Sequence, residues 1–383
     1  IPELAIEFIV LRRSLNKNIQ INFGITATSS RKSRLCSFAA RDFLGRPCPT
    51  GRADFANAKS GIMDEHGGNI EQALKQYRLA ENAVIDFSAN INPLGMPYAV
   101  KRALIKAMDS LDRYPECEYL ELRKDLAGFY RVKPQNLLVD NGSVSLIHLI
   151  PRALGLRSAL IPIPAFSEYE KAARLARGEV KFLKPKADLS LDMDNLIKGL
   201  KGRDSLYLAS PNNPTSLSLE KKDLLMVLRE TKNRGVTFIL DEVFMEFSDS
   251  PRKNSLIQEA VQSRNLIILR SMTKFFALAG LRLGAAIAHP KMIARLKKYQ
   301  PPWPVNSLAA AAAREFLKDK KYIRDSYKLI QEEKEFLYSE LSAFKALKVW
   351  KPSANFILCR IISPPLVGGV RGGGIRGRLA LKG

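Results

Sequence analysis

The sequence contains few of the residues that build metal centres and disulfide frameworks. Only four cysteines and three histidines occur among its 383 residues. The cysteines are scattered without CxxC spacing, so neither a zinc site nor a disulfide framework is expected, and a reducing cytoplasm fits. No apolar run reaches the length of a membrane span, and residues 1–11 lack the basic lead of a signal peptide. We therefore expect a cytoplasmic protein that uses neither a metal nor a membrane.

Acidic residues are also scarce. The chain has 61 lysines and arginines against 38 aspartates and glutamates, a formal net charge of +23. Such an excess can indicate nucleic-acid binding. However, residues 1–60 carry +6 and residues 363–383 carry +4, which leaves +13 spread over the rest of the chain. A solvated basic surface is the expected explanation, and its field would help to collect a doubly anionic phosphate substrate.

The middle of the chain alternates between strand-like and helix-like segments. Short apolar runs at 136–140, 158–163, 206–210, 236–241 and 265–270 are each followed by a turn and, in most cases, by a helical pattern. This alternation predicts an α/β fold with a mostly parallel sheet that is covered on both faces by helices. The length allows one large domain and a smaller one.

The segment 271–284, SMTKFFALAGLRLG, carries the strongest chemical signal. Lys274 lies alone among apolar residues, where a lysine can lose its proton and act as an amine nucleophile. A hydroxyl at Ser271 and a guanidinium at Arg282 suit a phosphate group. An imine-forming lysine beside a phosphate site is what pyridoxal 5'-phosphate (PLP) requires.

Three other strand ends supply partners for such a cofactor. Asp241 ends an apolar run and could keep the cofactor's ring nitrogen protonated. Asn213 follows another run and could donate to the ring's phenolic oxygen. The turn at Gly142 and Ser143 begins a helix whose free amides could bind the phosphate. Each signal alone has an ordinary explanation, such as a surface charge, a helix cap or a turn, and the order of all of them favours the cofactor.

These residues resemble the fold type I PLP enzymes, in the aminotransferase branch that includes histidinol-phosphate aminotransferase. Within that branch the chain looks most like the L-threonine-O-3-phosphate decarboxylases of the cobalamin pathway. The closer likeness depends on three stretches: His66-Gly-Gly-Asn69, residues 86–95 (DFSANINPLG) and Asp241-Glu-Val-Phe244. The aminotransferases usually carry a tyrosine at the position of Phe244. The resemblance covers roughly residues 64 to 362.

The resemblance implies roles for further residues. Phe166 would stack on the cofactor ring, although a core aromatic is an equally good explanation. Tyr114 would reach the cofactor phosphate of a neighbouring subunit, which implies a homodimer with shared active sites; otherwise it is an ordinary loop tyrosine. His66 and, more weakly, Asn90 would lie near the substrate phosphate, although a lone histidine is more often structural.

The expected activity is that of a PLP-dependent carboxy-lyase acting on a small phosphorylated amino acid. It would convert L-threonine-O-3-phosphate to (R)-1-amino-2-propanol O-2-phosphate and CO2, with Lys274 as a candidate proton donor. Three alternatives stay open: a histidinol-phosphate or related aminotransferase, a catalytically impaired protein with a PLP fold, and, as a distant third, a nucleic-acid binder.

Composition predicts that the two ends differ from the middle. Residues 26–60 are rich in Ser, Arg, Ala and Gly, and residues 363–383 contain seven glycines and no aromatic residue. We expect a reading frame that extends upstream of a start near Met63, and a frameshift or truncation after Ile362. The expected division is 1–62 as a non-native or disordered extension, 63–95 as an N-terminal arm, 96–304 as the large PLP-binding domain, 305–362 as a partial small domain, and 363–383 as an aberrant glycine-rich tail.

Family members continue beyond the stretch that resembles residues 355–360, into a part that carries the arginines for the substrate's carboxylate. This chain has no match for them, since Arg371, Arg376 and Arg378 lie in the glycine-rich tail without a motif context.

Overall fold

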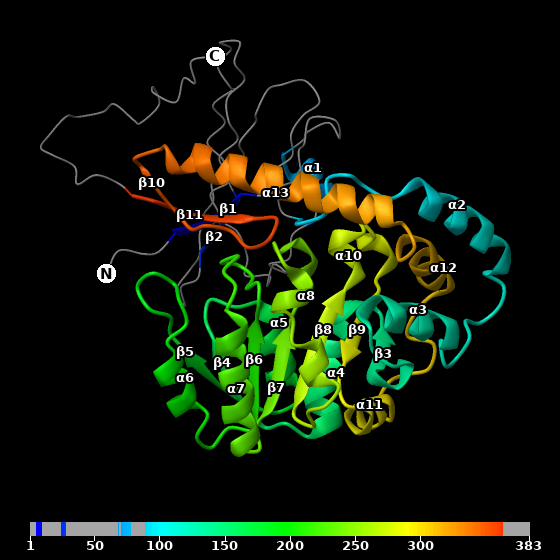
Figure 1. Cartoon of the computed structure of the whole chain (residues 1–383), viewed down its shortest axis with the longest axis horizontal. Helices are drawn as coiled ribbons and strands as arrows, with labels where there is room; N and C mark the ends of the chain where they lie inside the picture. The colour runs from blue at the N-terminus through cyan, green and yellow to red at the C-terminus, as the bar shows by residue number, and fades with distance from the viewer. Residues whose placement is uncertain (1–4, 10–23, 28–67, 69, 78–88, 363–383) are drawn as a thin grey trace, which may run out of the picture.

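The computed structural model describes residues 5–9, 24–27, 68, 70–77 and 89–362, and its centre is a seven-stranded sheet (Figure 1). The strand order is β3-β9-β8-β7-β6-β4-β5. The strands are β3 (Leu137–Asp140), β4 (Ser158–Pro162), β5 (Glu179–Leu183), β6 (Ser205–Ala209), β7 (Thr237–Asp241), β8 (Leu266–Ser271) and β9 (Gly284–Ile287). Five neighbouring strands, from β8 to β5, pair in parallel, whereas β9 is antiparallel to both of its neighbours. The predicted α/β fold with a mostly parallel sheet is confirmed.

Helices cover both faces of this sheet. Alternate residues of β7 show why: Phe238 and Leu240 enter one apolar cluster, while Ile239, pointing to the opposite face, enters another. The first cluster is covered by α3 (Leu120–Tyr130), α7 (Lys221–Asn233) and α12 (Ser307–Phe316). The second is covered by α4 (Gly142–Leu154), α5 (Ser167–Leu175) and α11 (Pro290–Lys297). Burial on both faces explains why the strands read as continuous apolar runs.

The remaining helices lie around this core. They are α1 (Ile70–Tyr77), α2 (Tyr98–Ala107), α6 (Met193–Gly199), α8 (Pro251–Asn254), α9 (Ile257–Ala260), α10 (Met272–Phe275) and α13 (Lys320–Ser342). The long helix α13 crosses above the carboxyl ends of the central strands (Figure 1). Asp319 caps its first turn by accepting from the backbone amide of Tyr322 at 2.8 Å.

A second, smaller sheet lies beside α13. Its order is β10-β11-β1-β2, and every pair in it is antiparallel. The strands are β10 (Leu347–Val349), β11 (Ile357–Ile361), β1 (Ala5–Ile9) and β2 (Gly24–Ala27). From residues 1–62, β1 therefore pairs with β11 and β2 pairs with β1, while the division of the chain into domains stays a prediction.

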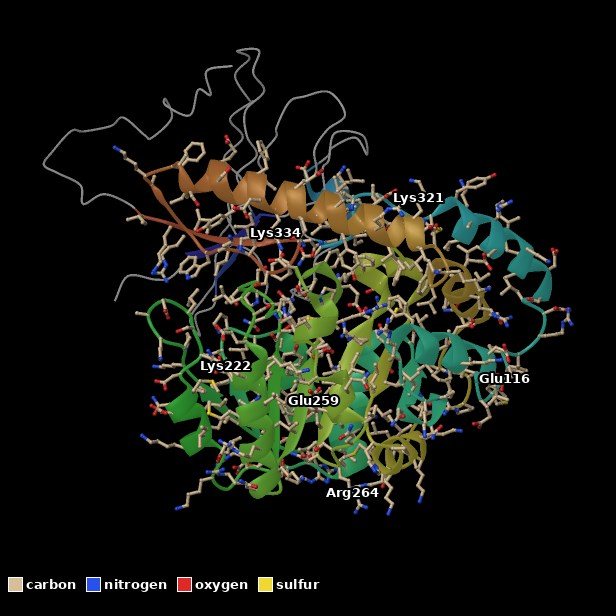
Figure 2. The ribbon with its side chains drawn as sticks, in the orientation of Figure 1. Glu116, Lys222, Glu259, Arg264, Lys321 and Lys334 are labelled. Carbon is tan, nitrogen blue, oxygen red and sulfur yellow. The ribbon has the colours of Figure 1, made fainter. Side chains whose placement is uncertain are left out.

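Charged side chains lie over the outer surface of several elements. Lys222 on α7, Arg264 before β8 and Lys321 on α13 are all exposed (Figure 2). Lys222 pairs with Glu220 at 2.7 Å, and Lys321 pairs with Asp325 one helical turn away. Such exposed pairs contribute little stability, typically about 0–1 kcal/mol. Among the described residues, no helix combines the length and the apolar character needed to cross a membrane.

Candidate active site

Lys274 lies where the sequence placed it, just after the central strand β8. Ser271 ends that strand and caps the short helix α10, since its hydroxyl oxygen accepts from the amide of Thr273 at 3.3 Å. Lys274 is half-buried, whereas its neighbours in the chain, Thr273, Phe275 and Phe276, are buried. Its carbonyl oxygen accepts from the amide of Asn92 at 3.0 Å, so the segment that follows Asn90 passes beside the lysine.

Asp241 ends the neighbouring strand β7 and is 7% exposed. Its carboxylate accepts from the Tyr169 hydroxyl at 2.6 Å and from the amide of Val243 at 2.9 Å. Burial raises the pKa of Asp241, and these two hydrogen bonds oppose the rise because they favour the charged form. Burial and the nearby carboxylate hold the pKa of Tyr169 well above its usual range, so Tyr169 is a permanent donor.

Sequence reasoning missed Tyr169. The residue lies in the first turn of α5, three positions after Phe166, and its ring meets that of Phe166 edge to face with centroids 5.7 Å apart. Phe166 is half-buried and packs against the second apolar cluster, so its stacking on a cofactor ring stays a prediction. A tyrosine one helical turn after the expected stacking ring was the available signal.

The expected phosphate residues converge at one end of the sheet. The hydroxyls of Ser271 and Thr273 lie 2.7 Å apart, and Thr273 was not predicted. Helix α4 begins at Gly142, and Ser143 follows in its first turn with a backbone amide near the helix end. The guanidinium of Arg282 lies against this turn, because a Cβ placed on Gly142 would come within 2.7 Å of Nη2. We call these residues the phosphate cradle: Gly142, Ser143, Ser271, Thr273 and Arg282.

The Asn213 turn is fixed from two directions. The neighbouring Asn212 donates to the carbonyl of Pro164 at 3.0 Å and to Thr215 at 3.0 Å, which joins the loop after β6 to the loop after β4. From the other side, the amide of Ser353 donates to the carbonyl of Ser216 at 2.8 Å, and the amide of Ala354 donates to its hydroxyl oxygen at 2.9 Å. Asn213 itself is half-buried in this turn.

The other predicted site residues have different surroundings. Tyr114 is 78% exposed and stacks on Trp303, with ring centroids 4.4 Å apart. Phe244 is buried and meets Phe356 edge to face at 4.9 Å. His66 and the three tail arginines lie outside the described residues. The individual roles expected for the site residues stay predictions.

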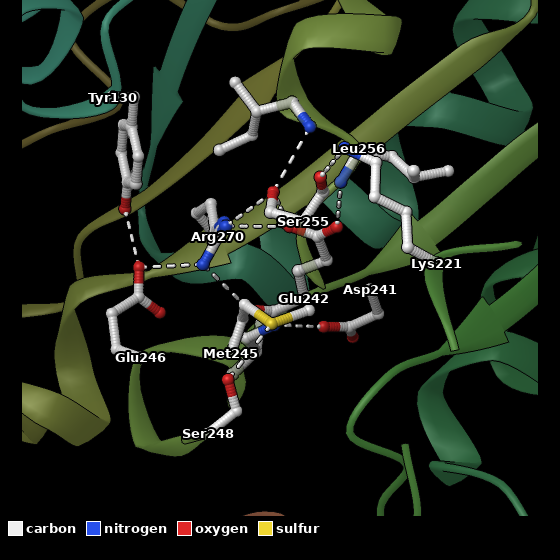
Figure 3. A network of polar contacts seen from close by, with 12 residues as sticks. Tyr130, Lys221, Asp241, Glu242, Met245, Glu246, Ser248, Ser255, Leu256 and Arg270 are labelled. Atoms are coloured by element: carbon white, nitrogen blue, oxygen red, sulfur yellow. Dashed lines mark hydrogen bonds and ion pairs between the residues drawn. The ribbon is translucent and has the colours of Figure 1, made fainter. Parts of the chain in front are cut away.

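A buried cluster of charged side chains lies beside Asp241 (Figure 3). Arg270, four residues before Lys274, pairs with Glu242 at 2.7 Å and with Glu246 at 2.8 Å. Ser255 donates to Glu242 at 2.6 Å and accepts from Arg270 at 3.0 Å, so the pair is also hydrogen-bonded. The guanidinium therefore fastens the end of β7 to β8, and sequence reasoning did not find it.

The donor set fits PLP. A buried carboxylate ends β7, and a half-buried lysine follows the adjacent strand β8. A cradle of hydroxyls, a guanidinium and helix amides lies at the end of β8. These groups match a protonated pyridine nitrogen, an aldehyde and a phosphate.

Comparison of the chain with known protein families and structures agrees with a PLP site. The chain matches the family model described as "Aminotransferase class I and II" over residues 82–367. It therefore belongs to that family, whose enzymes depend on PLP, and the resemblance seen in the sequence is confirmed.

Both decarboxylases and aminotransferases occur among its relatives. The chain is 36% identical over 298 residues to the threonine-phosphate decarboxylase of Salmonella typhimurium, which covers 77% of this chain and 81% of that protein. It is 32% identical over 296 residues to the histidinol-phosphate aminotransferase of Chlorobium phaeobacteroides, with 75% and 81% covered. The crystal structure of the histidinol-phosphate aminotransferase from Clostridium acetobutylicum matches with a TM-score of 0.69 and 32% identity, over 73% of this chain and 83% of that one.

Proposed function

We propose that this chain decarboxylates L-threonine-O-3-phosphate, giving (R)-1-amino-2-propanol O-2-phosphate and CO2. The likeness to the Salmonella decarboxylase supports this choice among the family's reactions. The structural observation that carries it is the buried Phe244 at the end of β7, packed on Phe356. A phenylalanine there offers the cofactor no hydroxyl, unlike the tyrosine expected in the aminotransferases.

PLP, when bound, supplies an electron sink for the pair released when a bond at the substrate's Cα breaks. Lys274 would hold the cofactor through its amine, and Asp241 would keep the ring nitrogen protonated. The hydrogen bond from Tyr169 favours the charged form of Asp241 and orients its carboxylate. The phosphate cradle would hold the cofactor's phosphate, and Asn213 would donate to its phenolic oxygen.

The protein must also supply one proton to the substrate. Decarboxylation breaks the bond between Cα and the carboxylate carbon, and Cα must then take up a proton. The Lys274 amine is the candidate donor, because Lys274 follows β8, which pairs in parallel with the strand that ends at Asp241. Phe275 and Phe276, the two residues that follow the lysine, are both 1% exposed and belong to the first apolar cluster. A substrate bearing a phosphate also suits the chain's net charge of +23.

A substrate comparison tests the proposal directly. Purified protein with PLP is given threonine phosphate alone and, separately, histidinol phosphate with 2-oxoglutarate. CO2 release without any keto acid supports the decarboxylase. Glutamate formation from the second mixture would replace it with the aminotransferase, which the Clostridium structure and the Chlorobium relative favour. Binding of PLP without turnover of either substrate would indicate an impaired enzyme.

The proposal includes a homodimer, supported by an apolar outer face on α2. Ile105 on that helix is 60% exposed, and Met108, which directly follows the helix, is 59% exposed. Beside them lies a hollow between α2 and α12, and its lining residues are Met96, Lys101, Leu104, Ile105, Met108 and Leu308. Tyr114 and Trp303, which stack on each other, are also exposed. A second copy of the chain is the occupant that would also bring Tyr114 to a neighbouring cofactor.

Sedimentation of the purified protein tests the dimer. We expect the wild type to sediment as a dimer and Ile105→Glu to sediment as a monomer, because the new charge would be buried in the contact. Leu175→Glu changes an equally exposed leucine on α5 and is the matched control. A monomeric wild type at micromolar concentration would exclude the dimer.

A further inference from the structure

Gly284 lies between the two strands that carry the phosphate cradle. It is the first residue of β9, and it pairs with Asp140 of β3 on one side and with Ser271 of β8 on the other. Asp140 leads directly into the turn that begins α4, and Ser271 is a cradle residue. Gly284 thus touches both halves of the cradle through its backbone.

The first turn of α4 packs directly on Gly284. A Cβ at this position would lie 2.4 Å from the amide nitrogen of Ser143 and 2.5 Å from the carbonyl carbon of Gly142. Both are backbone atoms, so the only relief is a displacement of the whole turn. The φ angle of Gly284 is outside the left-handed region, unlike that of Gly142 at +79°. Glycine is therefore required here by space and not by backbone conformation.

We propose that Gly284 is a positioning residue for the cofactor's phosphate. By lacking a side chain, it lets the first amides of α4 close onto Ser271 and Arg282. The guanidinium of Arg282, two residues before Gly284, packs against the same turn at Gly142. With alanine at 284, an ordinary van der Waals contact would require the turn to retreat by about 1 Å, which weakens several hydrogen bonds at once. This inference assumes the PLP site proposed above.

The test compares PLP with pyridoxal, which lacks the phosphate. Dissociation constants of both compounds are measured by equilibrium dialysis on cofactor-free Gly284→Ala and wild-type protein. We expect about a tenfold or greater loss of PLP affinity, with pyridoxal affinity changed by less than about threefold, because only the phosphate contacts move. Gly280→Ala is the matched control, since a Cβ there meets nothing within 4 Å, and it should leave both affinities unchanged.

A second variant disturbs the contact between Arg282 and the first turn of α4. Gly142→Ala would place a Cβ 2.7 Å from the Arg282 guanidinium, and it should produce the same selective loss. The proposal is wrong if Gly284→Ala keeps wild-type PLP affinity, or if both compounds lose affinity equally. It is also wrong if Gly284→Ala lacks the native circular dichroism spectrum, because the glycine would then serve the fold as a whole. Failure of the cofactor proposal looks different, since the wild type itself would then show no preference for PLP over pyridoxal.

Discussion

The Tyr169 hydroxyl donates a 2.6 Å hydrogen bond to Asp241, and both side chains are buried. Because this bond favours the charged carboxylate, Tyr169→Phe should raise the pKa of Asp241 further above its usual range. Asp241 would then lose its charge at a higher pH, and PLP affinity would fall more at pH 6 than at pH 8. The loss expected for one hydrogen bond to a charged group is about 1.5–3 kcal/mol, measured by PLP titration.

Tyr207→Phe is the matched control for that experiment. Its ring stacks on Tyr169 at 5.6 Å, and its buried hydroxyl has no hydrogen-bond partner among the described residues. Removing this hydroxyl should leave cofactor affinity unchanged. Equal losses in both variants would assign the effect to packing and not to the bond with Asp241.

Asp241→Asn should separate stability from cofactor binding. Burial raises the pKa of Asp241, so the folded cofactor-free protein holds this proton more tightly than the unfolded chain. The free energy of unfolding therefore falls as pH rises from about 4, the ordinary value for an aspartate, through the raised pKa. Asparagine lacks this slope, so cofactor-free Asp241→Asn should resist urea better than the wild type at pH 8, while binding PLP more weakly. Parallel stability curves for the two proteins between pH 4 and pH 8 would contradict this prediction.

The Arg270 cluster should be costly to break. Arg270→Met leaves Glu242 and Glu246 buried without their cation, and we expect a loss of about 3–5 kcal/mol in urea unfolding. Arg174→Met is the comparison, because it breaks an ion pair with Glu170 in which both side chains are about half exposed. That change should cost less than about 1 kcal/mol. Similar losses in the two variants would mean that the cluster contributes no more than a surface pair.

Phe244→Tyr tests whether position 244 lies within hydrogen-bonding reach of the cofactor. The ring is buried against Phe356, so a new hydroxyl should cost the cofactor-free protein about 1–3 kcal/mol unless it finds a partner. If bound PLP accepts from that hydroxyl, PLP should raise the melting temperature more in Phe244→Tyr than in the wild type. Phe247→Tyr, at a fully buried neighbouring ring, should be destabilised without this recovery. An equal response to PLP in Phe244→Tyr and the wild type would place position 244 out of the cofactor's reach.

The cofactor link itself can be trapped. Borohydride reduction of PLP-saturated protein should leave a pyridoxyl group on Lys274, identified by peptide mass spectrometry. Lys274→Ala should leave no such adduct, and Lys291→Ala, at a lysine on α11, should not affect it. A pyridoxyl group on a different lysine would overturn the assignment of Lys274.

Much of this arrangement could be predicted from sequence because the site residues follow buried strands. Asp241 and Ser271 end apolar runs, and in a parallel sheet such ends share one edge. The same pattern predicted the turn at Gly142. By contrast, β9 was missed, because its four residues, GAAI, have weak strand preference and are held by the strands on either side. The edge strand β5 was missed as well, since its residues are mostly exposed and show no continuous apolar run.

The unpredicted site residues share a different cause. Tyr169 is remote in sequence from Asp241, and Arg270 is remote from Glu242. Their roles arise only when β7 lies beside α5 and β8, and no local pattern records such pairings. The close packing of Gly284 on Ser143 could not be predicted either, because no local pattern distinguishes this glycine from any other at the start of a strand.

The two hydrogen bonds from residues 353 and 354 to Ser216 join the Asn213 turn to the chain that enters β11. Any displacement of residues 353 and 354 would therefore have to break these bonds or shift the Asn213 turn as well, so the position of that turn depends on a segment about 140 residues further along the chain.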